Sequence, residues 1–453
     1  MRIKLMGLTL AVCAISACEA VGPNFQRPQI SLSESFAKSP ASALRQAADD
    51  EWWTALNDPV LNKLMSRALA QGLTVQAARA QILEARAVLR GSGPSADLTG
   101  DLTLNVDHDS RFGSNSSTDN SASAAFSPSF LVDLFGERRR ITEQAQALVN
   151  AAVFDEAAAR LALQLEVATT YFDLRFFQRS EVLRRRSIAQ RAELVNILKQ
   201  RADSQTVTKF ELSRSQAELD LERALLPATR TGINANAFAL ATLLSEPADR
   251  ILKEVARKRA KQPVPKRGFA AGLPAGLLQN RPDIRAAEAQ LAAATAEVGI
   301  FEAQLYPSLT IGGTLSANTS TGINVGAGLN LPILDRAVRK SSRDASKARA
   351  LQADINWRQT VLASIEEVQT NLVSIGNIDS QLQSLERANR TYVDAVRLTR
   401  EAFELGAVTF NEIIESENTL TLAEISLADA KRDYASTWAQ LNVAIGQGWH
   451  VTP

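Results

Sequence analysis

Hydrophobic and polar residues alternate with a period of two in two separate parts of the chain. In the first part the apolar positions are Leu98, Gly100, Leu102, Leu104 and Val106, then, after a polar loop at 109–120, a weaker set at Ala122, Ala124, Phe126 and Phe130. In the second part they are Leu309, Ile311, Gly313, Leu315 and Ala317, then, after a short turn at 318–322, Ile323, Val325, Ala327, Leu329 and Leu331. Such alternation predicts β-strands, here two hairpins. Each strand has about ten residues, the length that a tilted strand needs to cross a membrane.

Four strands are too few to close a membrane barrel, because the smallest such barrels have about eight. Membrane-crossing hairpins would therefore require several subunits to share one barrel, each contributing its four strands. The strand pattern alone does not choose between a dimer, with a filled barrel, and a trimer, with a lumen. It is also compatible with two half-buried hairpins on a soluble sheet.

The rest of the chain is predicted to be helical. From about Arg336 to Leu405 there is no proline and one internal glycine, Gly376, so one helix of about 70 residues would reach roughly 100 Å. Its apolar positions recur about every 3.4 residues, less than the 3.6 of a straight helix, which indicates left-handed coiling around neighbouring helices. A matching long helix is predicted at 137–202, and shorter return helices are predicted at 209–244 and 410–445.

Both halves of the chain have the same order of elements: helix, hairpin, long helix, tip and return helix. The tip at 202–212 (ADSQTVTKFEL) aligns with that at 403–413 (FELGAVTFNEI), and the basic residues at 138–140 align with 338–340. We therefore predict an internal duplication, which makes a pseudo-symmetric ring easy to build.

The expected segments follow from these patterns. They are, in chain order, a lipoprotein-type signal peptide at 1–17, an N-terminal segment with the first helices at 18–96, the first hairpin at 97–133, the first long helical hairpin at 134–246, an irregular segment at 247–275, a helix of the second repeat at 276–306, the second hairpin at 307–332, the second long helical hairpin at 333–446, and a tail at 447–453.

Composition and charge argue against catalysis and nucleic-acid binding. Lys and Arg number 50 and Asp and Glu 49, for a net charge of +1, so no basic footprint for nucleic acid is expected. The two histidines, His108 and His450, are far apart in sequence, and both cysteines lie among the first twenty residues. We find no pattern for a nucleophile–histidine pair, a metal cluster or a phosphate loop, so neither an enzyme nor a cofactor is expected.

The N-terminus resembles a secretory signal peptide. Arg2 and Lys4 precede an apolar stretch at 5–14 that is too short to span a bilayer as a mature helix. Residues 15–18 (ISAC) match a bacterial lipobox, in which the cysteine is acylated and becomes the new N-terminus. We therefore predict that Cys18 is lipidated and that Cys13 is lost with the leader. An ordinary signal peptide cut near Ala17 is the alternative.

Several motifs in order resemble the TolC-type outer-membrane factor family, in its lipoprotein (NodT-like) branch. They are residues 21–28 (VGPNFQRP), Trp52-Trp53, residues 133–136 (DLFG), residues 277–288 (LLQNRPDIRAAE) and residues 446–449 (GQGW). The resemblance covers nearly the whole mature chain. One departure is Gln205, where the first tip of family members usually has glycine.

The resemblance implies a homotrimer in the outer membrane of a Gram-negative bacterium, anchored by lipid and extending into the periplasm. Its twelve shared strands would form an open barrel continuous with a long helical tunnel. It also implies two partners, a periplasmic adaptor (membrane fusion) protein and an inner-membrane resistance-nodulation-division pump, and a role as a passive efflux duct. A type I protein-secretion duct and a non-conducting periplasmic structural protein are the alternatives.

By the same resemblance, the second tip is expected to be a periplasmic gate. Asn411 and Glu415, four residues apart and so on one helix face, look similar to the two constriction rings of the family. Glu412 lies beside them, Gly406 is a natural hinge, and Arg214 is the first-half counterpart of Glu415. Arg214 could pair with a tip carboxylate. The alternative is that these glutamates form a solvated helix face.

Overall fold

The computed structural model describes residues 20–30, 51–93, 97–111, 117–204, 206–256, 261–266, 281–317 and 321–449. Cys18, Gln205 and the turn at 318–320 lie outside these residues, as does 267–275 of the segment expected to be irregular. No helix among the described residues is both long and apolar enough to span a membrane.

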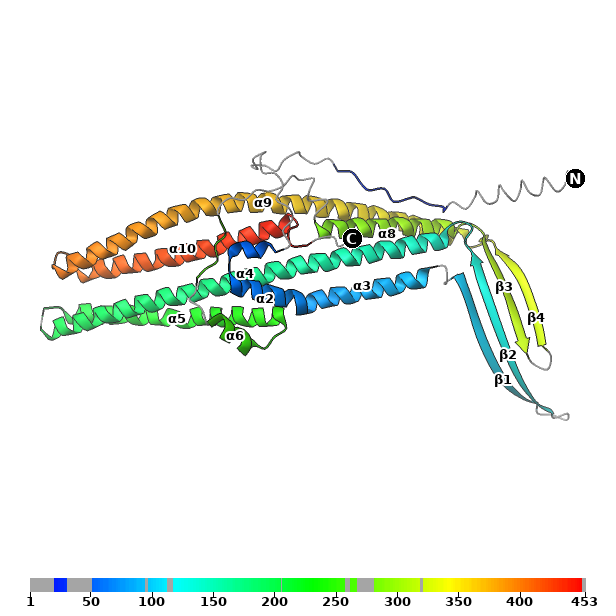
Figure 1. Ribbon diagram of the computed structural model, residues 1–453, viewed down its shortest axis with the longest axis horizontal. Coiled ribbons are helices and arrows are strands. Elements are labelled where there is room, and N and C mark those ends of the chain that lie inside the picture. The colour runs from blue at the N-terminus through cyan, green and yellow to red at the C-terminus, as the bar shows by residue number, and fades with distance from the viewer. Residues whose placement is uncertain are drawn as a thin grey trace. The chain divides into compact units, whose positions relative to one another are not determined.

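The described chain is mostly helical and contains one antiparallel sheet of four strands (Figure 1), which confirms the predicted fold class of long helices with two hairpins. The elements are η1 (Trp52–Leu56), α2 (Pro59–Gln71), α3 (Leu73–Ser92), β1 (Leu98–Arg111), β2 (Ser117–Val132), α4 (Glu137–Asp203), α5 (Lys209–Leu244), α6 (Ala248–Ala256), α8 (Pro282–Ala303), β3 (Ser308–Ala317), β4 (Thr321–Asn330), α9 (Arg336–Glu404) and α10 (Phe410–Ala444).

The sheet has the order β1-β2-β3-β4, so the two hairpins pair through β2 and β3. The partners include Leu104 and Ala124 in the first hairpin and Phe126 and Leu315 between the hairpins. The β2–β3 ladder is interrupted at Pro128, which has no N–H to donate. β1 and β4 are the edges of the sheet, and every residue of β4 is exposed.

The first hairpin is longer than its apolar pattern predicted. The prediction of a polar loop over 109–120 is wrong in its extent, because β1 continues to Arg111 and β2 begins at Ser117. Pairing continues because the ladder is made by backbone groups, which do not depend on side-chain polarity. The change from apolar to polar residues in the sequence therefore shows where the apolar band ends, but the strands continue beyond it.

The first of two compact units combines Met1–Ser31, Ala78–Glu156 and Asp283–Val361 and contains the sheet. Within it α3 runs antiparallel to α4, with Arg79 of α3 paired to Glu156 at 3.2 Å and the Thr142 hydroxyl donating to the Ser92 carbonyl at 2.8 Å. Small side chains allow its helices to approach closely. The buried alanines of these helices include Ala145, Ala147, Ala151, Ala286, Ala289, Ala293 and Ala296.

The second unit combines Leu32–Ala77, Ala157–Pro282 and Leu362–Pro453 and holds the larger aromatic core. Trp52 packs edge-on against Trp53 and Trp438, with ring centroids 5.8 and 5.6 Å away. The fully buried Gln164 accepts from the Trp52 indole at 3.1 Å and donates to the Gly448 carbonyl at 2.9 Å. One amide thus joins three segments that are far apart in sequence.

The segment 247–275 was expected to be irregular, and this is wrong at its start, where α6 is a helix of 9 residues. Ile251 and Val255, four residues apart, are buried on one face of it. The high content of Pro, Lys and Arg in this segment obscured two apolar positions at helical spacing.

The amide of Gln164 is the basis of a stability prediction. Gln164→Leu should lower the free energy of unfolding by about 2–3 kcal/mol, because the Trp52 indole and the Gly448 carbonyl would remain buried without partners. Thermal denaturation in detergent measures the loss. Gln200→Leu, an exposed position on the same helix, is the control, and equal destabilisation by both variants would contradict the proposed role of Gln164.

Candidate gate at the helical tips

The second tip is a tight turn centred on a glycine. α9 ends at Glu404, and Gly406 follows in the left-handed region with φ of 73°. Its N–H donates to the Phe403 carbonyl at 3.0 Å, and that of Ala407 donates to the Ala402 carbonyl at 2.8 Å. Such bonds end a helix by satisfying its last carbonyls, and the left-handed residue is usually glycine. A Cβ at Gly406 would meet no atom within 4 Å, so the backbone angle, not space, requires glycine here.

Both return helices begin with the same capping box, which supports the duplication inferred from sequence. Thr208 and Glu211 cap α5, and Thr409 and Glu412 cap α10. In each box the threonine and glutamate satisfy helix N–H groups that otherwise have no partner. The Thr409 N–H, and then its hydroxyl, lower the pKa of the Glu412 carboxyl. Glu412 therefore caps the N-terminus of α10.

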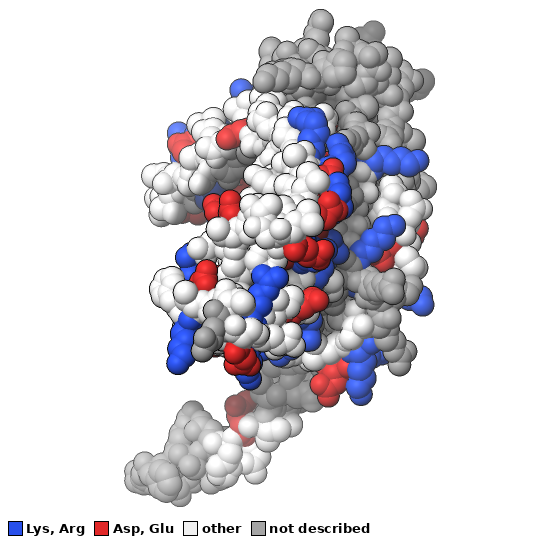
Figure 2. Space-filling model, turned by 90° about the vertical axis from the view of Figure 1, so that its left-hand side faces the viewer, with Lys and Arg blue, Asp and Glu red and all other residues white. Residues whose placement is uncertain are grey.

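Asn411 and Glu415 are both exposed, one turn apart on α10. Figure 2 views the molecule from the side on which the tips lie in Figure 1, and acidic and basic side chains are interspersed over that face. An amide and a carboxylate are thus exposed on one helix face at this tip.

A small hydrophobic cluster packs α10 against α4 beneath this exposed face. Leu194 and Leu198 of α4 contact a set from α10 consisting of Phe410, Ile413 and Ile414. Val207, Leu212 and Phe403 cover the cluster, and the Arg201 guanidinium lies 4.8 Å from the centre of the Phe403 ring. The two tips are therefore packed together by apolar contacts.

Glu417, two residues beyond Glu415 on α10, is buried and paired. Arg400 of α9 donates from Nε to its Oε1 at 2.9 Å and from Nη2 to the same oxygen. The Glu417 side chain is 7% exposed and that of Arg400 is 41% exposed. Their pairing joins the two helices of the second hairpin, α9 and α10.

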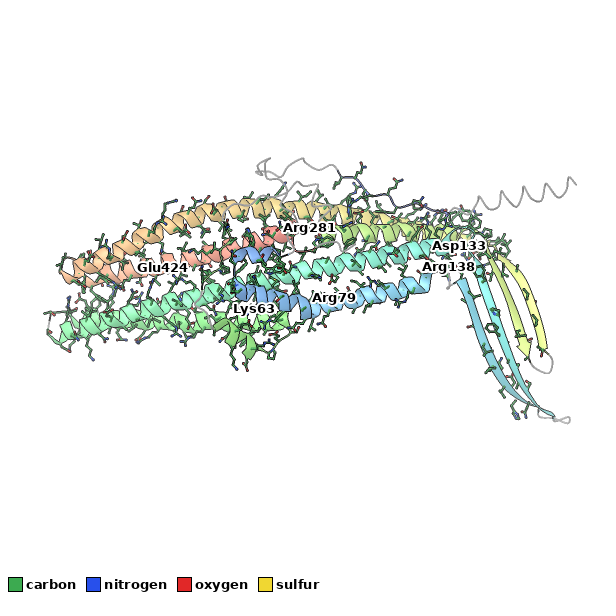
Figure 3. All side chains as sticks on the ribbon, in the orientation of Figure 1. Lys63, Arg79, Asp133, Arg138, Arg281 and Glu424 are labelled. Atoms are coloured by element: carbon green, nitrogen blue, oxygen red, sulfur yellow. The ribbon has the colours of Figure 1, made fainter. Side chains whose placement is uncertain are left out.

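A second buried carboxylate lies two turns further along the same face of α10. Glu424, labelled in Figure 3, pairs with Arg186 of α4, so this pair joins the second hairpin to the first. Burial, followed by the nearby Arg179 and Arg400 guanidinium groups, lowers the pKa of Arg186. In the first hairpin Arg184 and Arg191 of α4 face Glu222 of α5 at 3.2 and 4.0 Å.

Sequence reasoning missed these ion pairs, although a signal was present. Glu417 and Glu424 are seven residues apart and share a helix face with apolar residues such as Ile413 and Ile414. Charged residues at core positions of a coiled coil are expected to have partners. Arg214 is exposed on α5, and within the described residues no ion pair joins it to a tip carboxylate of the same chain.

In the part of the chain that the structure describes, the duplicated helical hairpins, the open sheet and the capped tips define the fold of an outer-membrane channel subunit. Residues 64–246 and 273–447 match the outer membrane efflux protein family. The chain belongs to this family, which confirms the resemblance inferred from its motifs.

Individual relatives resemble the chain over nearly its full length. It is 31% identical to nodulation protein T of Rhizobium leguminosarum bv. trifolii, over 96% of each chain. It is 28% identical to the pyoverdine export outer membrane protein OpmQ of Pseudomonas aeruginosa, over 99% of this chain and 98% of OpmQ. The solved structure of the Campylobacter jejuni CmeC outer membrane channel has the same fold, with a TM-score of 0.86 at 20% identity over 96% of each chain.

The unequal exposure of the Arg400–Glu417 pair leads to an asymmetric prediction. Arg400→Met should lower the free energy of unfolding by about 3 kcal/mol, because it leaves a carboxylate buried without a partner. Glu417→Leu should cost about 1 kcal/mol, because Arg400 can turn to solvent. The double variant should be close to wild type. Hydrogen exchange of 410–420 with thermal denaturation measures these effects, and equal costs for both single variants would refute the account.

Proposed function

We propose that the chain is the exit duct of a tripartite efflux system, which passively conducts small solutes passed on by an inner-membrane pump and a periplasmic adaptor. The observation that carries this proposal is the open sheet. Its edge strands β1 and β4 have no partner on their outer sides in the described chain, and large apolar residues are exposed along it. The most exposed of these residues are Leu98, Leu102, Leu104, Val106, Ile323, Val325 and Leu329.

Unpaired strand edges are stable in a membrane when a neighbouring chain completes the ladder. β1 of one subunit would pair with β4 of the next, and three subunits would close a barrel of about twelve strands that is wide enough for a lumen. Two subunits would give about eight strands, and such barrels are filled by side chains. Conduction therefore favours the trimer.

Lipidation of Cys18 would add a second attachment to the membrane. The family match and the lipobox support it, because small residues precede a cysteine that cleavage would leave as the first residue. A single acyl chain binds a membrane weakly, and two or more bind it stably. The lipid would thus hold the protein at the membrane surface.

The gate would lie where three copies of the second tip meet. Three Glu415 carboxylates around one axis would attract cations and narrow the passage, with Asn411 forming a neighbouring ring. The exposure of both side chains and the left-handed turn at Gly406 support this arrangement. Arg214 would pair with a tip carboxylate of a neighbouring subunit and hold the gate shut.

A drug-efflux role with a resistance-nodulation-division pump is favoured over protein secretion by the family match and by the lipoprotein-type N-terminus. The identity of the solute would be set mainly by that pump. A non-conducting structural role differs in having no conductance.

The first prediction tests the shared barrel. Native mass spectrometry in detergent should give a mass of three chains, because only neighbouring chains can satisfy the strand edges. A stable monomer with full β-content would contradict the proposal.

The second prediction tests conduction and the gate in planar bilayers. The wild-type pore should conduct little without a partner. Glu415→Ala should raise single-channel conductance at least about twofold and reduce cation preference, because it removes bulk and charge from the axis. Asn411→Ala should open the pore less, and the double change should exceed either change alone because the rings act in series.

Glu404→Ala is the control for the gate, since Glu404 is an exposed carboxylate at the end of α9. It should leave conductance unchanged. If it behaves like Glu415→Ala, the glutamates are a solvated helix face and the gate lies elsewhere. If no variant conducts, the chain is not a duct.

A further inference from the structure

The first described residues, 20–30, form an extended segment bound to the first unit. The segment begins at the base of the sheet (Figure 1), where the Val21 N–H donates to the Phe135 carbonyl at 3.0 Å. Further along, Arg27 pairs with Glu288 of α8 at 2.8 Å. We call residues 20–30 the N-terminal segment.

One buried arginine donates several hydrogen bonds to the start of this segment. Arg140 of α4 is 3% exposed. Its guanidinium donates to the carbonyls of Ala20, Val21 and Gly22 at 3.3, 3.1 and 3.2 Å and to Oδ1 of Asn24 at 2.8 Å. Nη1 donates to Glu143 at 2.7 Å, which balances the charge. Most acceptors are backbone carbonyls, so this site recognises a chain conformation as well as a sequence.

Three glycines allow the segment to approach this closely. A Cβ on Gly22, whose φ is 90°, would lie 2.6 Å from the Cα of Gly299 on α8. A Cβ on Gly299 would lie 2.7 Å from the Arg140 side chain, and one on Gly136 would lie 2.4 Å from Ala20. Contacts this short would force the chain apart, so the fit requires glycine on both sides of the contact.

The described residues of the second half contain no buried arginine that binds a chain segment in this way. Arg339, the fourth residue of α9 as Arg140 is of α4, is partly exposed, pairs with Asp335 and donates to the single carbonyl of Gln304. Lys340, which aligns with Arg140 in the duplication, is exposed at the start of α9. The first turn of a long helix in this fold therefore does not in general require a buried arginine. It occurs in the half to which the N-terminal segment binds.

We propose that Arg140, Gly136 and Gly299 form a binding site for the mature N-terminus, which fixes the anchor cysteine at the base of the sheet. This inference rests on the proposed lipidation of Cys18. Two residues of extended chain span at most about 7 Å, so Cys18 must lie within about 7 Å of Ala20, which is held at this site. Arg140 is thus a positioning residue for the lipid, and the acyl chains enter the membrane at the sheet–helix junction that Asp133 and Arg138 mark in Figure 3.

Release of the segment is opposed by the loss of its hydrogen bonds with Arg140. The carbonyls of residues 20–22 and Oδ1 of Asn24 would be lost together, which would leave Glu143 as the remaining partner of Arg140 among those described above. Hydrogen bonds to a charged group are stronger than neutral ones, and an unmatched buried charge is costly. The anchor and the junction therefore stabilise each other.

Limited proteolysis of the detergent-solubilised full chain tests this site. Chymotrypsin cuts after Phe25 once the segment detaches, and mass spectrometry identifies the released peptide 18–25 and any acyl groups on it. Arg140→Ala and Gly299→Ala should release the peptide at least about tenfold faster than wild type. Gly22→Ala and Asn24→Ala change the segment itself and should also speed release, so the test stands if Arg140→Ala does not fold.

Lys340→Ala and Gly91→Ala are the matched controls, because Lys340 is the exposed counterpart and Gly91 is a helical glycine with no atom near its Cβ position. Both should release the peptide at the wild-type rate. Wild-type release as fast as that of Arg140→Ala, with both chains trimeric, would overturn the site. Slow release of an unacylated peptide would refute lipidation and leave the site intact, so the two failures are distinguishable.

Discussion

The constraint on which the rest of the structure depends is the unpaired backbone at the two edges of the sheet. Four strands in the order β1-β2-β3-β4 satisfy each other internally and leave β1 and β4 open among the described residues. In a membrane no water can satisfy those groups, so another chain must. In the proposed trimer, association follows from the backbone and would place three copies of each helix around one axis. The long helices and their tips would then form a ring, because the four-stranded sheet does not close alone.

The long helices of the chain must be held in register with one another over many turns, and buried ion pairs supply that register. Arg400–Glu417 joins α9 to α10, and Arg186–Glu424 joins α10 to α4. Such pairs add less to stability than apolar contacts of the same volume, but they disfavour shifted arrangements, because a shift leaves a buried charge unpaired. The apolar cluster at the tips has no such specificity. It contributes adhesion, and the ion pairs determine which turn of one helix meets which turn of the next.

Much of this architecture could be predicted from sequence. The return helix at 209–244 agrees with α5, and the other long helices were placed to within a residue. For the longest of them, the stretch without proline and the recurrence of apolar residues at helical spacing indicated its extent. The strand ends were missed because backbone pairing outlasts the apolar pattern. The pairing of Glu417 with Arg400 was missed because a sequence shows a charge and not its partner. The site around Arg140 could not be predicted, since its ligands are mostly carbonyls, which every residue has, although Gly22 already stood in the N-terminal motif.

The duplication supplies two equal scaffolds, and the differences between them identify the specialised positions. Each tip has a threonine–glutamate cap, yet the second has Gly406 in a left-handed turn and an exposed carboxylate at Glu415, where the first has Arg214. At the starts of the long helices α4 and α9, far from the tips, Arg140 is buried and Lys340 is exposed. Shared residues therefore build the two helical hairpins. The residues that differ are those proposed to act, with the second half providing the gate and the first half holding the anchored N-terminus.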